Sequence, residues 1–97
     1  METKRQPTHP GEILKEEFMK PLGITQVDLA KNLGVSFRTI SELVNEKRAV
    51  SPEMALRLSK YFRTSPELWL NLQNGYDLHK AAKKVEKALK AIQPAAA

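Results

Sequence analysis

The sequence has no cysteine among its 97 residues and only six aromatic residues, one Trp, two Tyr and three Phe. Without cysteine, disulfide bonds and thiolate metal sites are excluded, and a reducing compartment is the natural location. With so few aromatic residues, the core must be built largely from Leu, Ile, Val and Ala. No apolar run approaches the roughly 18 residues of a membrane span, and the first residues lack the apolar segment of a signal peptide. We therefore expect a cytoplasmic protein with no membrane partner.

The residue patterns of enzymes are also missing. The sequence has no Ser/His/Asp set, glycine-rich phosphate loop or paired-cysteine motif, and its two histidines are His9 and His79. The one set worth testing for a metal site is His9 with three acidic residues, Glu12, Glu16 and Glu17. Carboxylates near a helix N-terminus commonly stabilise the helix without any ligand. We expect no enzyme, cofactor, metal site or small-molecule substrate, and we interpret His9 as a helix cap or turn residue.

The charge of the chain favours an anionic partner, but only weakly. A length of 97 residues with 41% apolar and 28% charged content fits one small globular domain. The net charge of +5 and the pI near 9.6 are typical of proteins that bind nucleic acid. Residues 77–97, however, hold five lysines against Asp77 and Glu86, so this tail carries +3 of the net charge.

Helix-start signals recur about every ten to fifteen residues, and no stretch alternates as a half-buried strand would. The chain is therefore predicted to be all-α. The first helix should begin near Pro10, and Pro21 and Gly23 should end it. Two later helices are predicted from the same start signal, a serine cap followed by proline and glutamate, at residues 51–53 and 65–67.

Two short helices with a tight connection stand in the middle of the chain. Thr25 and Ser36 are typical N-caps, and they predict helices at about residues 26–33 and 37–45. Gly34 lies between them and can take the left-handed conformation that closes a helix. A short helix pair joined through one glycine has the geometry of a helix-turn-helix.

The second helix of this pair has one apolar and one polar face. Ile40, Leu43 and Val44 form the predicted buried stripe. In a DNA-binding helix-turn-helix, the N-terminal part of the second helix enters the major groove. The residues expected to contact DNA are Gln26, Ser36, Phe37, Arg38, Thr39, Ser41, Glu42, Asn45, Lys47 and Arg48.

Several of these residues have chemistry suited to a particular contact. Arg38 suits a bidentate contact to guanine, Glu42 can accept from cytosine N4, and Phe37 either lies on a thymine methyl or packs as local core. Lys47 and Arg48 suit phosphates by charge. Phosphate contacts also suit the starts of the two helices, namely Gln26, Ser36 and Thr39.

The chain is divided by these signals into an N-terminal arm at residues 1–9, a helix-turn-helix domain at residues 10–76, and a tail at residues 77–97. The tail is predicted to be a basic, heptad-like helix with a disordered end. Its apolar residues are spaced by four and three, at Leu78, Ala82, Val85, Leu89 and Ile92.

A homodimer is expected because one helix-turn-helix buries too little surface for high specificity. The contact between subunits can come from the seam in the tail or from the helix that precedes it. The candidate contacts are Leu68, Trp69, Leu72, Tyr76 and Leu78. Trp69 fits a purely intramolecular core equally well.

One family resemblance covers about residues 10–75. The central motif is TQVDLAKNLGVSFRTISELVNEKR, which resembles the lambda-repressor-like (XRE) helix-turn-helix. More specific are the flanks, HPGEILKEEFMKPLGIT and ALRLSKYFRTSPELWLNLQNGYDL, which look like those of HigA-type antitoxins from bacterial toxin–antitoxin operons. Glu46 stands where the family pattern has glycine, and this predicts either strain or a different turn. The basic tail is a second departure.

The resemblance implies a five-helix, lambda-repressor-like domain, here with a C-terminal helical extension. It further implies a dimer that binds a palindromic operator in its own promoter and neutralises a HigB-type toxin, an mRNA-cleaving ribonuclease. Two alternatives stay open at this point. One is a stand-alone helix-turn-helix repressor without a toxin, and the other is a toxin-binding inhibitor with little affinity for DNA.

Overall fold

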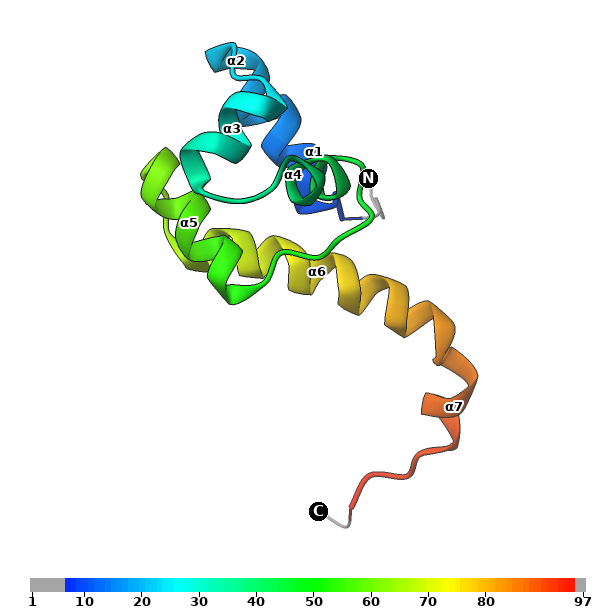
Figure 1. The fold of residues 1–97 in the computed structure, drawn as a ribbon. Coiled ribbons are helices and arrows are strands. Elements are labelled where there is room, and N and C mark those ends of the chain that lie inside the picture. The colour runs from blue at the N-terminus through cyan, green and yellow to red at the C-terminus, as the bar shows by residue number, and fades with distance from the viewer. Residues whose placement is uncertain (1–6, 96–97) are drawn as a thin grey trace.

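The computed structural model describes residues 7–95, and these residues form helices and no strand. The predicted all-α fold is confirmed. In chain order the elements are α1 (Pro10–Ile13), the π-helical segment η1 (Leu14–Met19), α2 (Lys20–Leu22), α3 (Gln26–Leu33), α4 (Phe37–Val44), α5 (Pro52–Phe62), α6 (Pro66–Lys84) and α7 (Glu86–Ala91). Because α1, η1 and α2 follow one another without a break, they act as the first helix of a five-helix head, and α7 lies beyond it (Figure 1).

Side-chain caps start five of these helices, as the sequence predicts. An oxygen of four residues accepts the backbone N–H three positions on at 3.1 Å: Thr25, Ser36, Ser51 and Ser65. His9 Nδ1 accepts the N–H of Gly11 at 2.8 Å, which confirms that His9 is a helix cap. Each cap supplies an acceptor for an N–H that has no partner inside its helix, a contribution of about 1 kcal/mol.

The first helix ends at Gly23, whose φ of 66° lies in the left-handed region. The N–H of Ile24 then bonds back to the carbonyl of Met19 at 2.9 Å, which closes the helix. The expectation that Pro21 also ends this helix is wrong, because Pro21 lies inside α2. The N–H of Lys20 still bonds in π register to Lys15. Pro21 therefore lies where the hydrogen-bond register of the helix changes from π to α. Its missing N–H removes few helical hydrogen bonds at that position.

The core of the head is mostly aliphatic, as the shortage of aromatic residues predicts. Phe18 packs against Phe62 and Trp69, with ring centroids 5.0 and 5.1 Å apart. Trp69 is fully buried, and its Nε1 donates to Thr64 Oγ1 at 2.8 Å. The buried apolar residues are Leu14, Met19, Leu29, Ala30, Leu33, Ile40, Leu43, Val44, Val50, Met54, Ala55, Leu58 and Trp69.

The first helix and α4 meet at Gly11. A Cβ atom placed on Gly11 would lie 1.8 Å from the carbonyl oxygen of Leu43, so no other residue fits without moving one of the two backbones. This close approach fixes the C-terminal end of α4 against the N-terminal end of the first helix.

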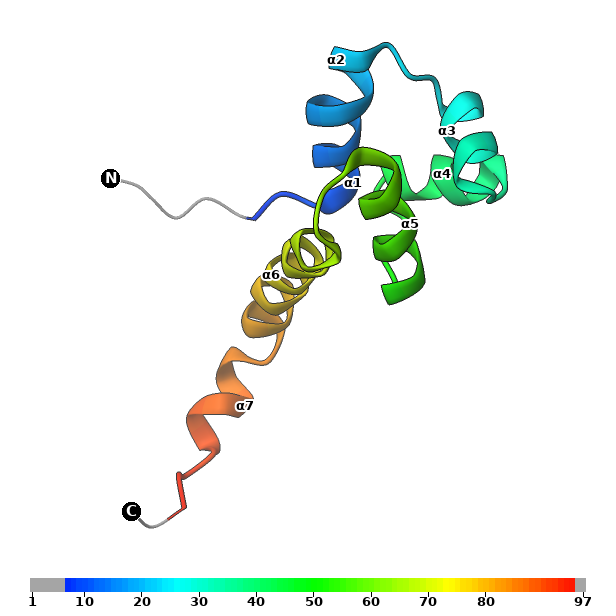
Figure 2. The ribbon, with the colours of Figure 1, turned by 90° about the vertical axis from the view of Figure 1, so that its left-hand side faces the viewer.

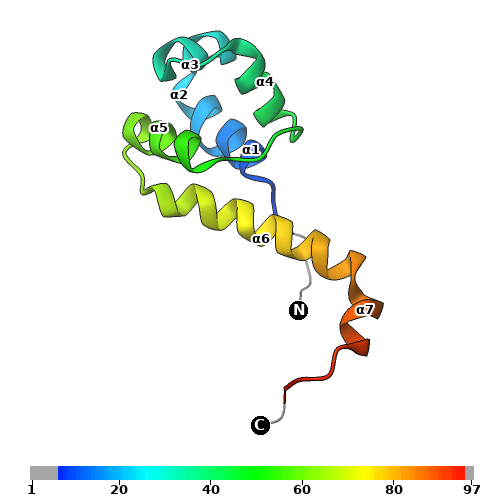
Figure 3. The same ribbon diagram turned by 60° about the horizontal axis from the view of Figure 1, so that its bottom comes forward.

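The C-terminal part of the chain leaves the head as an arm. α6 packs beside α5 in the head and then continues outward, and α7 prolongs the arm (Figures 2 and 3). Gly75 does not interrupt α6. The predicted heptad-like helix is instead divided, because the backbone leaves helical geometry at Val85, with φ −109° and ψ 17°.

The two ends of the chain are only partly covered. Residues 1–6 of the predicted N-terminal arm and residues 96–97 of the predicted disordered end lie outside the described residues. Among the helices that are described, none combines the length and the hydropathy that crossing a bilayer requires.

Candidate nucleic-acid interface

The pair formed by α3 and α4 has the short turn that the sequence predicts. Gly34 adopts φ 74°, and the N–H of Val35 bonds to the carbonyl of Ala30 at 3.0 Å. α3 occupies the expected residues 26–33, and α4 ends at Val44, one residue before the expected end. The buried faces of the two helices meet the core, which leaves the opposite face of α4 toward solvent.

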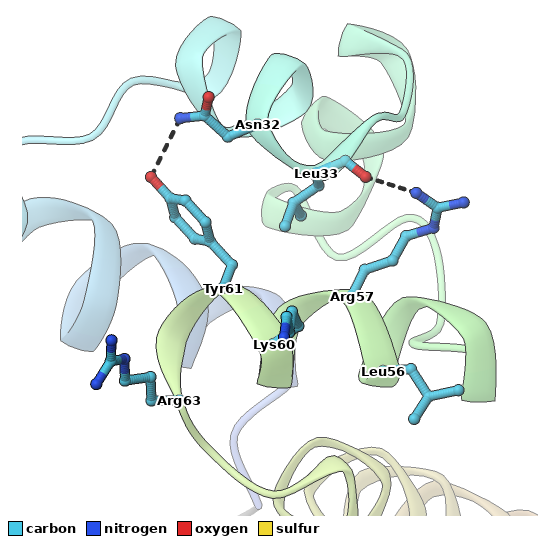
Figure 4. Close-up of a pocket in the computed structure, with 7 residues that line it drawn as sticks. All are labelled: Asn32, Leu33, Leu56, Arg57, Lys60, Tyr61 and Arg63. Carbon is cyan, nitrogen blue, oxygen red and sulfur yellow. Dashed lines mark hydrogen bonds between the residues drawn. The ribbon is translucent and has the colours of Figure 1, made fainter.

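α3 is also tied to α5 by two hydrogen bonds near its C-terminal end. Arg57 Nη1 donates to the carbonyl of Leu33 at 2.6 Å, and Asn32 Nδ2 donates to the hydroxyl of Tyr61 at 3.2 Å (Figure 4). Glu53 holds the same guanidinium from the preceding turn of α5. The bond to Leu33 satisfies a carbonyl that has no partner inside α3. Sequence reasoning missed this role of Arg57, because the two residues are 24 positions apart.

The ten residues expected to contact DNA lie at the start of α3, along α4 and in the loop that follows. Those with exposed side chains are Ser36, Phe37, Arg38, Asn45, Lys47 and Arg48, and those that are half-buried are Gln26, Thr39, Ser41 and Glu42. The exposed fraction is 53% for Phe37 and 84% for the Arg38 side chain. The alternative in which Phe37 packs as local core is therefore wrong.

Three of these residues are brought together by one carboxylate. Arg38 Nε donates to Glu42 Oε2 at 2.9 Å, one helical turn away. Arg48, from the loop, donates to Glu42 Oε1 through Nη2 at 2.7 Å and through Nε at 3.0 Å. The hydrogen bonds from Arg38 and then from Arg48 lower the pKa of the Glu42 carboxyl below its usual value, so Glu42 is ionised at neutral pH.

Other side chains of the same face bond within α4. Ser36 Oγ and Thr39 Oγ1 are 2.9 Å apart, and Asn45 Nδ2 donates to the carbonyl of Ser41 at 2.8 Å. Asn45 thereby caps the C-terminal end of α4. At the other end of the helix, the Ser36 hydroxyl oxygen accepts the N–H of Thr39.

Glu46 follows α4 in a left-handed conformation in spite of its side chain. Its φ is 62°, a left-handed value that glycine adopts more readily. The N–H of Glu46 bonds to the carbonyl of Leu43 at 3.0 Å, and that of Lys47 to the carbonyl of Glu42 at 2.8 Å. These two bonds form a Schellman ending. The strain predicted at Glu46 is therefore present in its positive φ.

The loop after α4 is fastened to α6 by a buried amide. Gln73 Oε1 accepts the N–H of Val50 at 2.8 Å, and Gln73 Nε2 donates to Asp77 Oδ1 at 3.0 Å. This bond fixes the chain two residues after Arg48, and so limits where the loop can carry its basic side chains. The link joins residues 23 positions apart, and sequence reasoning missed it.

The candidate dimer contacts are spread over α6. Trp69 is fully buried inside one chain. It is therefore part of the intramolecular core, and its prediction as a dimer contact is wrong. Leu72 packs against the core, and Tyr76 packs on the His9 ring with centroids 4.8 Å apart. Leu68 and Leu78 are exposed, Leu78 by 69%.

Comparison with known proteins matches this chain to helix-turn-helix proteins. A family described as Helix-turn-helix matches residues 15–69. Virulence-associated protein I of Dichelobacter nodosus is 45% identical over 86 residues, which cover 89% of this chain and 79% of that protein. Antitoxin HigA-1 of Vibrio cholerae is 38% identical over 92 residues, which cover 95% of this chain and 87% of the antitoxin. Other relatives are named HTH-type transcriptional regulators.

Solved structures resemble the whole chain. Pseudomonas aeruginosa antitoxin HigA, solved with the higBA promoter, has a TM-score of 0.88 and 42% identity, with 93% of this chain and 99% of that chain covered. Antitoxin GraA in complex with its operator has a TM-score of 0.89 and 41% identity, with 100% of this chain and 99% of that chain covered. The lambda-repressor-like fold predicted from the sequence is thereby confirmed.

Proposed function

The chain belongs to the helix-turn-helix family that includes the HigA antitoxins, and from this premise we propose that it is a DNA-binding antitoxin that represses its own operon. The observation that carries the proposal is the exposed face of α4, where Arg38 stands clear of the core beside a basic loop. Structural neighbours solved with promoter or operator DNA support it. The family comprises regulators and antitoxins rather than enzymes.

In this proposal the N-terminal half of α4 enters the major groove. Arg38 donates to guanine O6 and N7, and the exposed Phe37 ring lies on a thymine methyl. Lys47 and Arg48 contact phosphates, which carry most of the affinity that does not depend on sequence. The remaining proposed contacts are Gln26, Ser36, Thr39, Ser41 and Asn45, and Glu42 lies among them, bonded to Arg38 and Arg48. Ser36 and Gln26 stand at helix N-termini, where backbone N–H groups also face an anion.

We further propose that the protein acts as a homodimer on a two-fold symmetric operator. Two copies of α4 then read half-sites about one helical turn of DNA apart, roughly 34–36 Å. The exposed leucines of α6, Leu68 and Leu78, are the candidate contacts between the subunits, flanked by Leu72 and Tyr76. In the proposed division of the chain, residues 10–76 carry DNA binding and residues 77–97 form a basic extension.

The proposed second partner is a HigB-type toxin encoded beside this gene. Support comes from the names of the relatives, which include HigA-1, and from the coverage of nearly the whole chain by those relatives. Because both proposed partners, operator DNA and a toxin encoded beside it, would be met in the cytoplasm, we propose that location for the protein. Relatives named only as transcriptional regulators support the second candidate, a repressor without a toxin.

Two assays test these proposals separately. In a gel shift at about 100 mM salt, the DNA upstream of the gene should bind the purified protein at nanomolar concentration, whereas a shuffled duplex of equal length and composition should bind far more weakly. Equal binding to both duplexes would contradict sequence-specific repression. Co-expression of the protein with a tagged product of the adjacent reading frame should yield a stable complex. If that complex does not form while operator binding persists, the protein is a stand-alone repressor.

A further inference from the structure

Glu42 lies between two arginines of the proposed interface and uses both of its oxygens. Oε2 accepts one bond from Arg38, and Oε1 accepts two from Arg48. The Glu42 side chain is 27% exposed, whereas that of Arg38 is 84% exposed. The carboxylate therefore lies below the guanidinium of Arg38, nearer to the helix, and not at the tip of the surface.

The donors that remain on Arg38 are those that a guanine requires. A guanidinium has five N–H donors, and Arg38 gives only the Nε–H to Glu42. Within residues 7–95 neither terminal nitrogen is taken up, so both can pair in a bidentate manner with guanine O6 and N7. A base contact by Glu42 itself could use only the one acceptor site left on Oε2, which lies below the Arg38 guanidinium, or would have to displace one of its charge-assisted bonds.

We infer that Glu42 is a positioning residue, which holds Arg38 with its terminal nitrogens outward and joins Arg48 of the loop to α4, and which does not itself read a base. The inference rests on the proposed DNA-binding function. It replaces the contact to cytosine N4 that the sequence suggests for Glu42. Arg38 and Arg48 keep their proposed partners, guanine and phosphate.

Two physical effects make such a residue a source of specificity. A guanidinium already held in its binding orientation loses less conformational freedom when it meets the base. The carboxylate also disfavours positions of the protein on DNA in which Arg38 and Arg48 both bind phosphates instead. In such a position Glu42 would be left unpaired beside the negative charge of the DNA. Glu42 is thus expected to weaken non-specific binding while it strengthens discrimination at one base pair.

The test uses Glu42→Gln, which preserves the size of the side chain and removes its charge. Affinity is measured by fluorescence anisotropy for the operator, for operators altered at single base pairs, and for an unrelated duplex. Arg38→Ala identifies the base pair that Arg38 reads. At that base pair, Glu42→Gln should reduce discrimination by at least about fivefold, while affinity for the unrelated duplex rises slightly.

The chain offers a matched control in Glu53→Gln. Glu53 pairs with Arg57 four residues on, as Glu42 does with Arg38, but it belongs to α5, and its hydrogen bonds go to Arg57 rather than to Arg38 or Arg48. Glu53→Gln should leave discrimination unchanged, although it alters the net charge equally. If the two variants behave alike, the effect of Glu42 is one of net charge only, and the inference is overturned.

A double-mutant cycle separates positioning from direct reading. In the Arg38→Ala background, Glu42→Gln should cause no further loss of discrimination, since its effect passes through Arg38. A further loss at a cytosine-containing base pair would show that Glu42 reads a base directly and would overturn the inference.

In the free protein, the Arg38 Nε–H should give a protected, shifted NMR resonance that collapses toward the position of a free arginine in Glu42→Gln but not in Glu53→Gln.

The outcomes also distinguish this inference from the function on which it rests. A wild-type protein without any sequence preference would overturn the proposed function, and the inference with it. A wild-type preference that Glu42→Gln leaves intact, in a variant with an unchanged thermal unfolding curve, overturns the inference alone.

Discussion

At the scale of single residues, the turn after α4 is held in a conformation that its sequence does not favour. Glu46 has φ 62°, yet the hydrogen bonds on either side of it are those of an ordinary helix ending. A side chain in the left-handed region costs about 1 kcal/mol relative to glycine. The cost is tolerated because Gly11 on one side and Gln73 on the other fix the path of the chain.

Replacing Glu46 by glycine should therefore stabilise the protein. We expect the free energy of unfolding to rise by roughly 0.5–1 kcal/mol in urea titrations, since relief of the left-handed strain outweighs the added freedom of the unfolded chain. The matched control is Lys47→Gly, next in sequence but without a positive φ, which should destabilise the protein by a similar amount. Equal destabilisation by both substitutions would contradict the strain at Glu46.

At the scale of elements, the contact between the first helix and α4 depends on a missing side chain. Gly11 lets the two backbones approach so closely that a Cβ would lie 1.8 Å from the Leu43 carbonyl oxygen. Gly75, in contrast, lies inside α6, and a Cβ placed there meets no atom within 4 Å apart from its chain neighbours and the adjacent backbone of its own helix. The same substitution should thus have opposite effects in the two helices.

Gly11→Ala should lower the free energy of unfolding by about 1–3 kcal/mol or more, because a backbone carbonyl must move to admit the methyl group. Gly75→Ala should raise it by roughly 0.5–1 kcal/mol, the difference in helix propensity between the two residues. Thermal and urea unfolding of both variants measure these changes. Stabilisation by Gly11→Ala would show that α1 and α4 do not approach as closely as described.

Which elements could be predicted depended on how local their causes are. The starts of the helices were predictable from Thr25, Ser36, Ser51 and Ser65, because each cap bonds to a backbone N–H three residues on. The π-helical segment at residues 14–19, and the continuation of α6 through Gly75, carry no such local signal.

Only part of the candidate interface is predictable from the sequence, for the same reason. The exposed position of Arg38 is predictable from the helical period of α4. The bonds that shape the interface are not, since Arg48 reaches back six residues to Glu42, Arg57 reaches Leu33 and Gln73 reaches Val50. Such contacts depend on how the helices pack, which the pattern of one helix does not contain.

At the scale of the whole molecule, His9 joins α1 to α6 and links stability to pH. It caps α1, its ring packs on Tyr76 of α6, and the charges that act on it are those of Glu46, Asp77 and Lys80. Burial lowers the pKa of His9 below its ordinary value, an effect that outweighs the attraction of Glu46 and Asp77. The neutral ring is thus the form that the folded protein prefers.

The sign of the pH dependence follows from linkage. Because the pKa of His9 is lower in the folded than in the unfolded protein, its contribution to stability is complete above about pH 6.5 and is lost as the pH falls through the folded pKa. In urea titrations between pH 8 and pH 5.5, wild type should lose stability toward acid more steeply than His9→Asn. Asparagine can cap the helix without titrating. Parallel curves would contradict this role of His9.

Recognition of DNA through the exposed face of α4 is the central claim, and Arg38→Ala tests it most directly. Affinity is measured by fluorescence anisotropy for the operator and for an unrelated duplex, with Lys60→Ala on α5 as a control for the loss of one positive charge. Arg38→Ala should weaken operator binding by about 1–3 kcal/mol, and binding to the unrelated duplex only as much as Lys60→Ala does. If Arg38→Ala and Lys60→Ala weaken binding to both duplexes equally, α4 does not read the operator through Arg38.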